Sequence, residues 1–274
     1  MSINNKNKAN PSEILLEELA DNGVLRLTLN DAKRRNALSE EMMTKLATAL
    51  TRASENEDIR TIILAGNGPA FCSGHDLKQM SAARKNDDDG HAYFSKVFSS
   101  CSDLMQMIVN HPKPIIAEVS GVAAAAGCQL VACCDLAVAG ESARFITPGV
   151  NIGLFCSTPM VALSRNLSNK AAMEMLLTGE MVNSSKAERI GLINRVVEDK
   201  NVTHNTEELA SLIASKSSMV LETGKKAFYN QKDMPLSEAY EYASKVMVEN
   251  MLKNDASEGI NAFIEKRHPK WQDK

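Results

Sequence analysis

The chain has 274 residues, a length that fits one large α/β domain or a core with a helical extension. Hydrophobic residues make up 44% and charged residues 24%, the balance of an ordinary globular protein. The net charge of −3 gives no electrostatic reason to expect nucleic acid or an anionic membrane as a partner, although a local basic cluster could still hold an anionic ligand.

The first patterned segments predict a β-hairpin and a helix. The runs 14–19 and 24–29 flank the pair Asn22-Gly23, which is typical of a tight turn between two antiparallel strands. Helical periodicity begins after Ser39, whose hydroxyl suits a helix N-cap. We therefore expect a hairpin followed by a helix that starts at Ser39.

Strands and helices then alternate as far as Pro159. The β-branched run 61–65 and the segment 115–119 indicate buried strands, and a helix is expected between them from His91 to Val109. Such alternation indicates stacked βαβ units with parallel strands. After Pro159 the pattern is mostly helical, which predicts a core followed by a helical C-terminal region.

The N-terminus and the cysteines indicate the cellular setting. Residues 1–12 are polar and lack the apolar run of a secretory signal, so we expect a disordered tail. The six cysteines form no C-x-x-C pair, which favours free, mostly buried thiols in a reducing compartment and no metal site. We expect a cytoplasmic protein, or a mitochondrial matrix protein if a longer eukaryotic precursor exists.

Two loops between a strand and a helix could carry chemistry. The first is 71–77, with the sequence FCSGHDL, and the second is 120–129, with the sequence SGVAAAAGCQ. Small residues let a ligand approach the backbone, and free N–H groups at a helix start then point toward it. Two such groups meeting at one oxygen would form an oxyanion hole. The alternative is that both loops are tight packing turns.

With these loops the chain resembles the crotonase superfamily, the enoyl-CoA hydratase/isomerase family. The loop 71–77 is similar to the family motif F-x-x-G-x-D-[LI], and 121–135 is similar to G-x-[AV]-x-G-G-G-x-E-L-x-x-x-C-D. The resemblance extends over about residues 13–269. The segment 147–159 resembles the mitochondrial branch called enoyl-CoA hydratase domain-containing proteins and its bacterial relatives.

The resemblance implies a crotonase (ClpP-like) fold, a spiral of ββα units with a helical C-terminal trimerisation region. It implies a spiral core with an acyl-CoA site over residues 13–200. It also implies a helical region over 201–274 that mediates oligomerisation and completes the coenzyme A site. A homotrimer, or a hexamer made of two trimers, is the expected assembly.

The resemblance also implies a role for the two loops. An acyl-CoA thioester would be held with its carbonyl oxygen between the backbone N–H groups of His75 and Ala126. Each donor could contribute about 2.7–4 kcal/mol to an enolate-like transition state. Ala126 stands where the family has Gly, which is acceptable if its φ is negative. A direct catalytic role of the His75 imidazole is the less favoured alternative.

Coenzyme A would bind as part of the substrate thioester, and no permanently bound cofactor is expected. Cations before Asn36 would lie near its phosphates, the loop after Ser73 would border the adenine, and the C-terminal helix of a neighbouring subunit would complete the site. The implied contacts are Lys33, Arg34, Ala37, Ser73, Asp76, Leu77, Lys78, Phe263 and Lys266.

The chain departs from the family at its acid–base positions. The two hydratase glutamates correspond to Gln129 and Gly149, and the carboxylate of the dienoyl isomerases corresponds to Ser157. Gln cannot take a proton at neutral pH and Gly has no side chain, so hydration of an enoyl-CoA is expected to be weak or replaced by another reaction. The alternative is a non-catalytic acyl-CoA-binding or regulatory protein.

Other groups could supply a base. These lie on the turn that faces the acyl pocket in relatives and on the helix that begins at His91, but none has a visible partner in the sequence, so packing or surface roles are favoured. They are Thr147, Asn151, Cys156, Ser157, His91 and Asp103.

Overall fold

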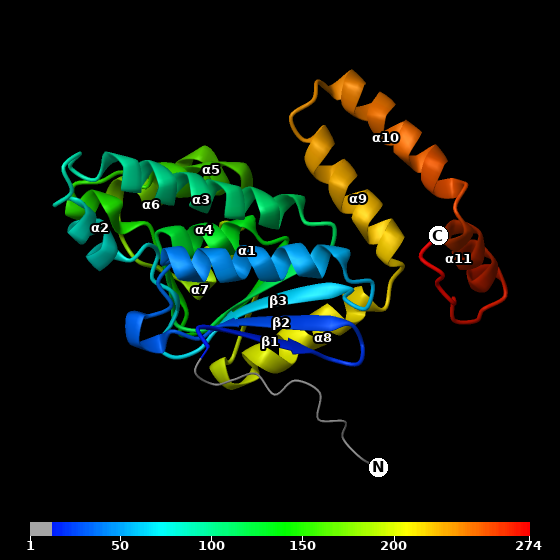
Figure 1. The fold of residues 1–274 in the computed structure, drawn as a ribbon. Coiled ribbons are helices and arrows are strands. Elements are labelled where there is room, and N and C mark those ends of the chain that lie inside the picture. The colour runs from blue at the N-terminus through cyan, green and yellow to red at the C-terminus, as the bar shows by residue number, and fades with distance from the viewer. Residues whose placement is uncertain (1–12) are drawn as a thin grey trace, which may run out of the picture.

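The computed structural model describes residues 13–274, so the tail expected over 1–12 lies outside the described residues. Two β-sheets and the helices around them form the fold (Figure 1). The larger sheet has the strand order β1-β2-β3-β5-β7-β10. Its strands are β1 Leu15–Leu19, β2 Val24–Leu29, β3 Thr61–Gly66, β5 Ile115–Val119, β7 Leu136–Gly140 and β10 Arg195–Val197.

The smaller sheet has the order β4-β6-β8-β9. Its strands are β4 Ala70–Cys72, β6 Val122–Ala124, β8 Arg144–Ile146 and β9 Val182–Asn183. Three times in succession the chain passes from a strand of the larger sheet to one of the smaller sheet and then into helical structure. This repeat is the expected spiral of ββα units. The sequence analysis missed β4, β6 and β8 because three residues are too few for a periodic pattern.

Eleven α-helices occur in the described residues. They are α1 Glu40–Glu55, α2 Leu77–Ala83, α3 His91–Asn110, α4 Ala126–Cys133, α5 Ser157–Asn166, α6 Asn169–Thr178, α7 Ser184–Arg189, α8 Val202–Ala214, α9 Ser218–Gln231, α10 Leu236–Met251 and α11 Asn254–Ile264. Short 3-10 helices are η1 Ala32–Arg34, η2 Pro148–Ile152 and η3 Asp199–Asn201.

The expected hairpin and first helix are confirmed. β1 and β2 pair antiparallel, and β2 joins β3 in parallel. The Ser39 side chain accepts a hydrogen bond from the amide of Met42 and so caps α1. Met42 and Leu46 lie fully buried on one face of that helix, which packs against α3. The periodic apolar residues of the sequence therefore face the core.

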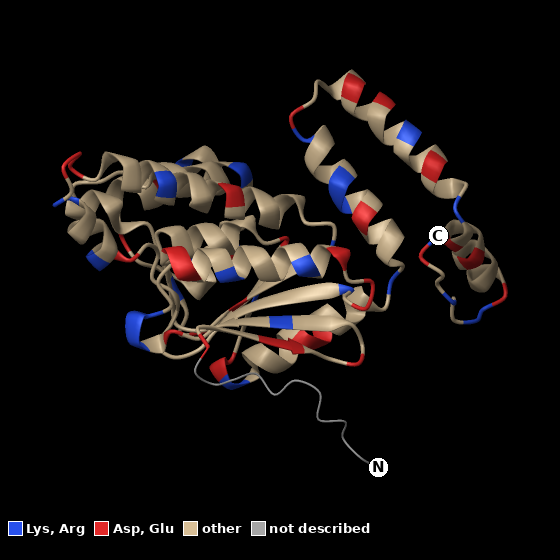
Figure 2. Ribbon diagram, viewed as in Figure 1, with Lys and Arg blue, Asp and Glu red and all other residues tan. Residues whose placement is uncertain are grey.

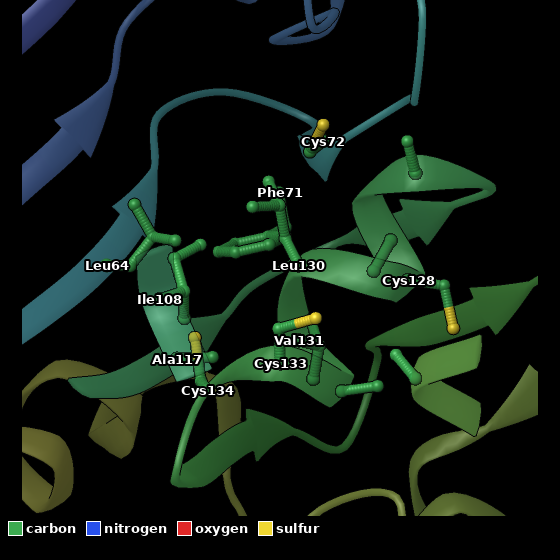
Figure 3. Close-up of a cluster of buried hydrophobic side chains, with 14 of the residues drawn as sticks. Leu64, Phe71, Cys72, Ile108, Ala117, Cys128, Leu130, Val131, Cys133 and Cys134 are labelled. Carbon is green, nitrogen blue, oxygen red and sulfur yellow. The ribbon is translucent and has the colours of Figure 1, made fainter. Parts of the chain in front are cut away.

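The main hydrophobic core lies between the two sheets and the helices α1, α3 and α4. Figure 3 shows Phe71 and Leu130 within this cluster, with Cys72 and Cys128 nearby on β4 and α4. All six cysteines are free and buried, as expected. The helix α4 is buried along its whole length, which explains its small and apolar sequence.

The C-terminal helices divide into two groups. α8 packs against β2, β3, β5 and β7 and so covers one face of the larger sheet. α9, α10 and α11 stand apart from the sheets (Figure 1), and none of the residues of α9 and α10 is fully buried. Helices α10 and α11 expose large apolar side chains, among them Leu236 and Phe263 at 75% and 85% exposure. No helix within residues 13–274 is long and apolar enough to cross a membrane.

Candidate functional site

The loop after β4 presents the backbone N–H of His75. Leu38 donates its amide to the carbonyl of Gly74 at 2.8 Å and forms an isolated parallel bridge with His75. In a parallel bridge one residue, here Leu38, bonds to the two neighbours of the other, so the amide of His75 faces away from Leu38. It donates to no acceptor among residues 13–274. The amide is therefore free to bind a ligand.

A second free amide opens α4. The helix begins at Ala126, whose N–H also lacks an acceptor in the described chain. Ala126 has a helical backbone, as its replacement of a glycine requires. The residue before it carries the unusual conformation: Ala125 has φ 49° and ψ −116°, while its amide donates to the Ile146 carbonyl at 2.8 Å. A non-glycine residue rarely adopts this region, so the start of α4 is strained.

The two loops are in direct contact. A Cβ atom added to Gly74, whose φ is +86°, would lie 3.3 Å from the Ala126 nitrogen and 3.0 Å from the Ala124 carbonyl oxygen. A Cβ atom on Gly127 would lie 2.1 Å from the Cys72 carbonyl oxygen. Only glycine at these two places allows the end of β4 to pack so closely on the start of α4. The residues next to both free amides are thereby brought together.

The imidazole of His75 has no hydrogen bond to a described residue. Both of its ring nitrogens are buried, and the ring meets Phe98 edge to face with centroids 5.4 Å apart. Burial lowers the pKa of His75, because the charged form of the ring loses its hydration. The ring is therefore neutral at pH 7.

The two positions expected for acid–base groups differ in structure. Gln129 on α4 is 4% exposed, and its Oε1 atom has no partner in the described residues. Gly149 lies in η2, where an added Cβ would be 2.8 Å from the Leu154 carbonyl oxygen and 2.9 Å from the Cys156 sulfur. No side chain fits at position 149 without a shift of its neighbours.

Most of the expected coenzyme A contacts cluster at one end of the fold. The amide of Ser73 donates to the Arg35 carbonyl at 3.0 Å, which joins the loop after β4 to η1. Arg34 Nη1 lies 3.6 Å from Asp76 Oδ2, and Asp76 caps α2 by accepting from the amide of Lys78. Figure 2 shows the basic stretch of η1 at the same end of the molecule as α2. Grouped there are Lys33, Arg34, Ala37, Ser73, Asp76, Leu77 and Lys78.

Phe263 and Lys266 are not part of this cluster within one chain. Phe263 belongs to α11 and Lys266 follows it, and Figure 1 shows α11 at the opposite end of the molecule from α2. Both residues are exposed. The expectation that they complete the site of a neighbouring subunit stays a prediction.

The other candidate groups have structural or surface roles. Thr147 is buried and donates to the Met175 carbonyl at 2.9 Å, and Asn151 donates to the Gly179 carbonyl at 3.2 Å. The Ser157 hydroxyl donates to the Phe155 carbonyl at 3.4 Å. His91 and Asp103 are exposed on α3. Residues 13–274 contain no group of three or more His, Cys, Asp or Glu side chains that could hold a metal ion.

A partly buried polar cluster was not found by the sequence analysis. Lys225 of α9 donates to Asp135 Oδ2 at 2.7 Å, and the Tyr229 hydroxyl donates to Asp135 Oδ1 at 3.1 Å. Burial beside Asp135 raises the pKa of Tyr229, which stays protonated. About ninety residues separate these groups, so no local pattern could have revealed the cluster. It holds α9 against the core.

Comparisons with known proteins find similar sequences over most of the chain. A sequence profile described as enoyl-CoA hydratase/isomerase matches residues 20–274. Enoyl-CoA hydratase domain-containing protein 3, mitochondrial, is similar to this chain: the Rattus norvegicus protein is 47% identical to it and the Homo sapiens protein 45%. Each alignment spans 249 residues, 91% of this chain, and 81% of the rat and 80% of the human protein.

Solved structures are similar over nearly the whole chain. A crystal structure described as enoyl-CoA hydratase from Mycobacterium smegmatis has a TM-score of 0.90 at 46% identity and covers 95% of this chain and 99% of its own. The structure of human enoyl-coenzyme A hydratase domain-containing protein 3 has a TM-score of 0.89 at 43% identity, covering 94% and 100%. These similarities confirm the expected crotonase fold.

Proposed function

Because the chain belongs to the enoyl-CoA hydratase/isomerase family, we propose that it binds an acyl-CoA thioester and polarises its carbonyl between the amides of His75 and Ala126. The observation that carries the proposal is the pair of unpartnered N–H groups on two loops that touch at Gly74 and Ala126. A buried N–H without an acceptor is costly, and a carbonyl oxygen would satisfy it. Each donor could stabilise an enolate-like transition state by about 2.7–4 kcal/mol.

The basic cluster on η1 supports binding of the coenzyme A phosphates. Lys33 and Arg34 lie beside the loop that presents His75, and the Arg34 side chain is 40% exposed. Arg34 already pairs with Asp31 and approaches Asp76, so its guanidinium is held in place before a phosphate arrives. Such orientation reduces the entropy cost of forming a charge-assisted hydrogen bond.

We propose that hydration of enoyl-CoA substrates is weak or replaced by another acyl-CoA reaction. Gln129 and Gly149 stand at the positions of the family's glutamates, and neither can exchange a proton at neutral pH. Loss of one general acid–base group typically costs about 10²–10⁴-fold in rate. The contacts around Gly149 support this reading, because they leave no room for a carboxylate there. The loss of these carboxylates would slow least a reaction that depends mainly on an oxyanion hole, such as thioester hydrolysis or decarboxylation.

The second candidate function is a non-catalytic acyl-CoA-binding or regulatory protein. The same residues favour it. The free backbone N–H groups of His75 and Ala126 can bind a thioester carbonyl, while Gln129 and Gly149 provide no group that could turn the thioester over. A turnover assay separates the candidates. If the protein is an enzyme, we expect product from at least one acyl-CoA. If it is a binding protein, we expect it to bind acyl-CoA and to form no product.

Calorimetry with acetyl-CoA tests the binding proposal. We expect binding to wild type that weakens roughly 10-fold when Lys33 and Arg34 are both replaced by Ala, because two phosphate contacts are lost. The exposed Lys200→Ala variant is the matched control and should bind as wild type does. Absence of heat and of any thermal shift at millimolar acetyl-CoA would contradict the proposal.

A hydratase assay with crotonyl-CoA tests the role of the missing carboxylates. We expect a rate at least about 100-fold below that of a hydratase with both glutamates, measured in parallel. A rate equal to that enzyme's would overturn our interpretation of Gln129 and Gly149.

We further propose that α10 and α11 form contacts between subunits of a homotrimer or hexamer. They expose several large apolar side chains, which a second copy of this chain could cover. Light scattering measures the mass of the assembly in solution.

For a eukaryotic chain we propose the mitochondrial matrix as the location, as the names of the rat and human relatives indicate. These names do not support the expected cytoplasmic location.

A further inference from the structure

A cavity of about 410 Å³ lies between α3, α4, α5 and α9. Gln129 of α4 forms part of its lining, whereas His75 and Ala126 do not. Apolar atoms make up the larger part of its surface, and side chains that can form hydrogen bonds lie among them. A mostly apolar cavity with a few polar groups is typical of a site that binds an organic ligand in one orientation.

The side chain of Gln129 is the least satisfied group in this lining. It is 4% exposed, and its buried Oε1 atom has no hydrogen-bond partner among the described residues. A buried polar atom without a partner typically costs about 1–3 kcal/mol. A ligand that supplies a hydrogen bond would recover this free energy, so the amide is a point of recognition.

The helix α4 links the free amide of Ala126 to the cavity. Ala126, Gln129 and Cys133 follow the spacing i, i+3, i+7 and so share one face of the helix. Gln129 and Cys133 both line the cavity. With a rise of about 1.5 Å per residue, Gln129 lies about 4.5 Å along the axis from Ala126. A thioester carbonyl held at Ala126 would therefore bring acyl carbons a few bonds away beside Gln129.

We propose that this cavity receives the acyl group of the thioester, an inference that rests on the proposed function. We propose that Gln129 selects acyl groups that carry an uncharged oxygen substituent. A hydroxyl or keto group can pair with an amide, which offers both a donor and an acceptor. A plain hydrocarbon chain would leave the amide unpaired. A carboxylate would meet a net charge of only +1 in the lining, because Asp233 offsets one of the two cations Arg165 and Lys232.

The two cations are also engaged already. Arg165 donates to the Val161 carbonyl at 3.2 Å, and Lys232 donates to the carbonyl of Arg165. Recognition therefore depends on the neutral amide of Gln129. Sites built to pair with a substrate hydroxyl discriminate strongly against the analogue that lacks it.

Calorimetry with thioesters of matched chain length tests the inference. The probes are butyryl-CoA, both enantiomers of 3-hydroxybutyryl-CoA, and succinyl-CoA as the carboxylate of the same length. We expect one hydroxylated thioester to bind wild type at least about 10-fold tighter than butyryl-CoA. Gln129→Met keeps the side-chain volume and removes the amide. It should bring the ratio of the two affinities, hydroxybutyryl-CoA to butyryl-CoA, close to one while acetyl-CoA still binds.

Gln106→Met is the matched control, because Gln106 also lines the cavity but its amide contacts Ser102. It should leave the ratio unchanged. Equal affinity of wild type for butyryl- and both hydroxybutyryl thioesters, an unchanged ratio in Gln129→Met, or tightest binding of succinyl-CoA would each overturn the inference alone. Failure of every thioester, acetyl-CoA included, would overturn the proposed function as well. Thermal unfolding of both variants establishes that they are folded.

Discussion

The sulfur of Cys156 lies 2.9 Å from the position that a Cβ atom on Gly149 would occupy. The Leu154 carbonyl oxygen is equally close, at 2.8 Å. Position 149 therefore lacks a carboxylate for a steric reason as well as a chemical one. A single Gly149→Glu substitution could not place a glutamate there without moving the segment that contains Leu154 and Cys156.

Gly149→Ala tests this crowding with one methyl group. We expect the free energy of unfolding to fall by about 1–3 kcal/mol, because the added atom overlaps backbone as well as a side chain. Gly224→Ala on α9 is the control: nothing lies within 4 Å of its added Cβ, and Ala favours a helix by about 1 kcal/mol. Urea unfolding of both variants gives the comparison, and a Gly149→Ala protein as stable as wild type would contradict the prediction.

Ala125→Gly should stabilise the protein. Ala125 has φ 49° and ψ −116°, a conformation that costs a non-glycine residue about 1–3 kcal/mol. Glycine relieves this strain but gains freedom in the unfolded chain, so we expect a net gain of about 1 kcal/mol. Ala124→Gly in the neighbouring strand β6 should instead lose about 0.5–1 kcal/mol. Loss of stability in both variants, measured in urea, would show that Ala125 is not strained.

Lys225→Met should loosen the attachment of α9. The variant leaves the partly buried Asp135 without its cation, and we expect a loss of at most about 3–5 kcal/mol, the typical cost of breaking a fully buried pair. Lys226→Met changes the neighbouring exposed lysine and should lie within about 0.5 kcal/mol of wild type. Chemical unfolding measures both, and amide hydrogen exchange should show faster opening of α9 in Lys225→Met. Equal stability of the two variants would contradict the prediction.

Stability should decrease below about pH 6.5, the ordinary pKa of histidine. Burial lowers the pKa of both His75 and His111 in the folded chain. Between the folded and the unfolded pKa the unfolded state binds more protons, so stability is complete above the unfolded pKa and is lost as the pH falls. Each histidine contributes a slope of at most about 1.4 kcal/mol per pH unit. His75→Phe should reduce the slope measured by urea unfolding between pH 7 and 5, and an unchanged slope would contradict a lowered pKa at His75.

Local features of the fold were predictable from neighbouring residues. The Ser39 cap, the hairpin of β1 and β2, and the long helices α1 and α3 depend on contacts within a few positions of each other. The two glycine-containing loops were also found, because small residues between a strand and a helix have few other uses. The lack of a carboxylate at Gln129 and Gly149 was visible in the sequence alone.

Contacts between distant segments needed the tertiary structure. The three-residue strands β4, β6 and β8 exist because they pair with one another, and their own sequences do not specify that. The close packing of Gly74 on Ala126, the crowding at Gly149 and the pairing of Asp135 with Lys225 each join residues whose meeting depends on packing. A sequence determines which groups can bind a thioester, whereas only the packed chain decides which of them meet, because hydrogen bonds and steric overlap act over a few ångströms of space.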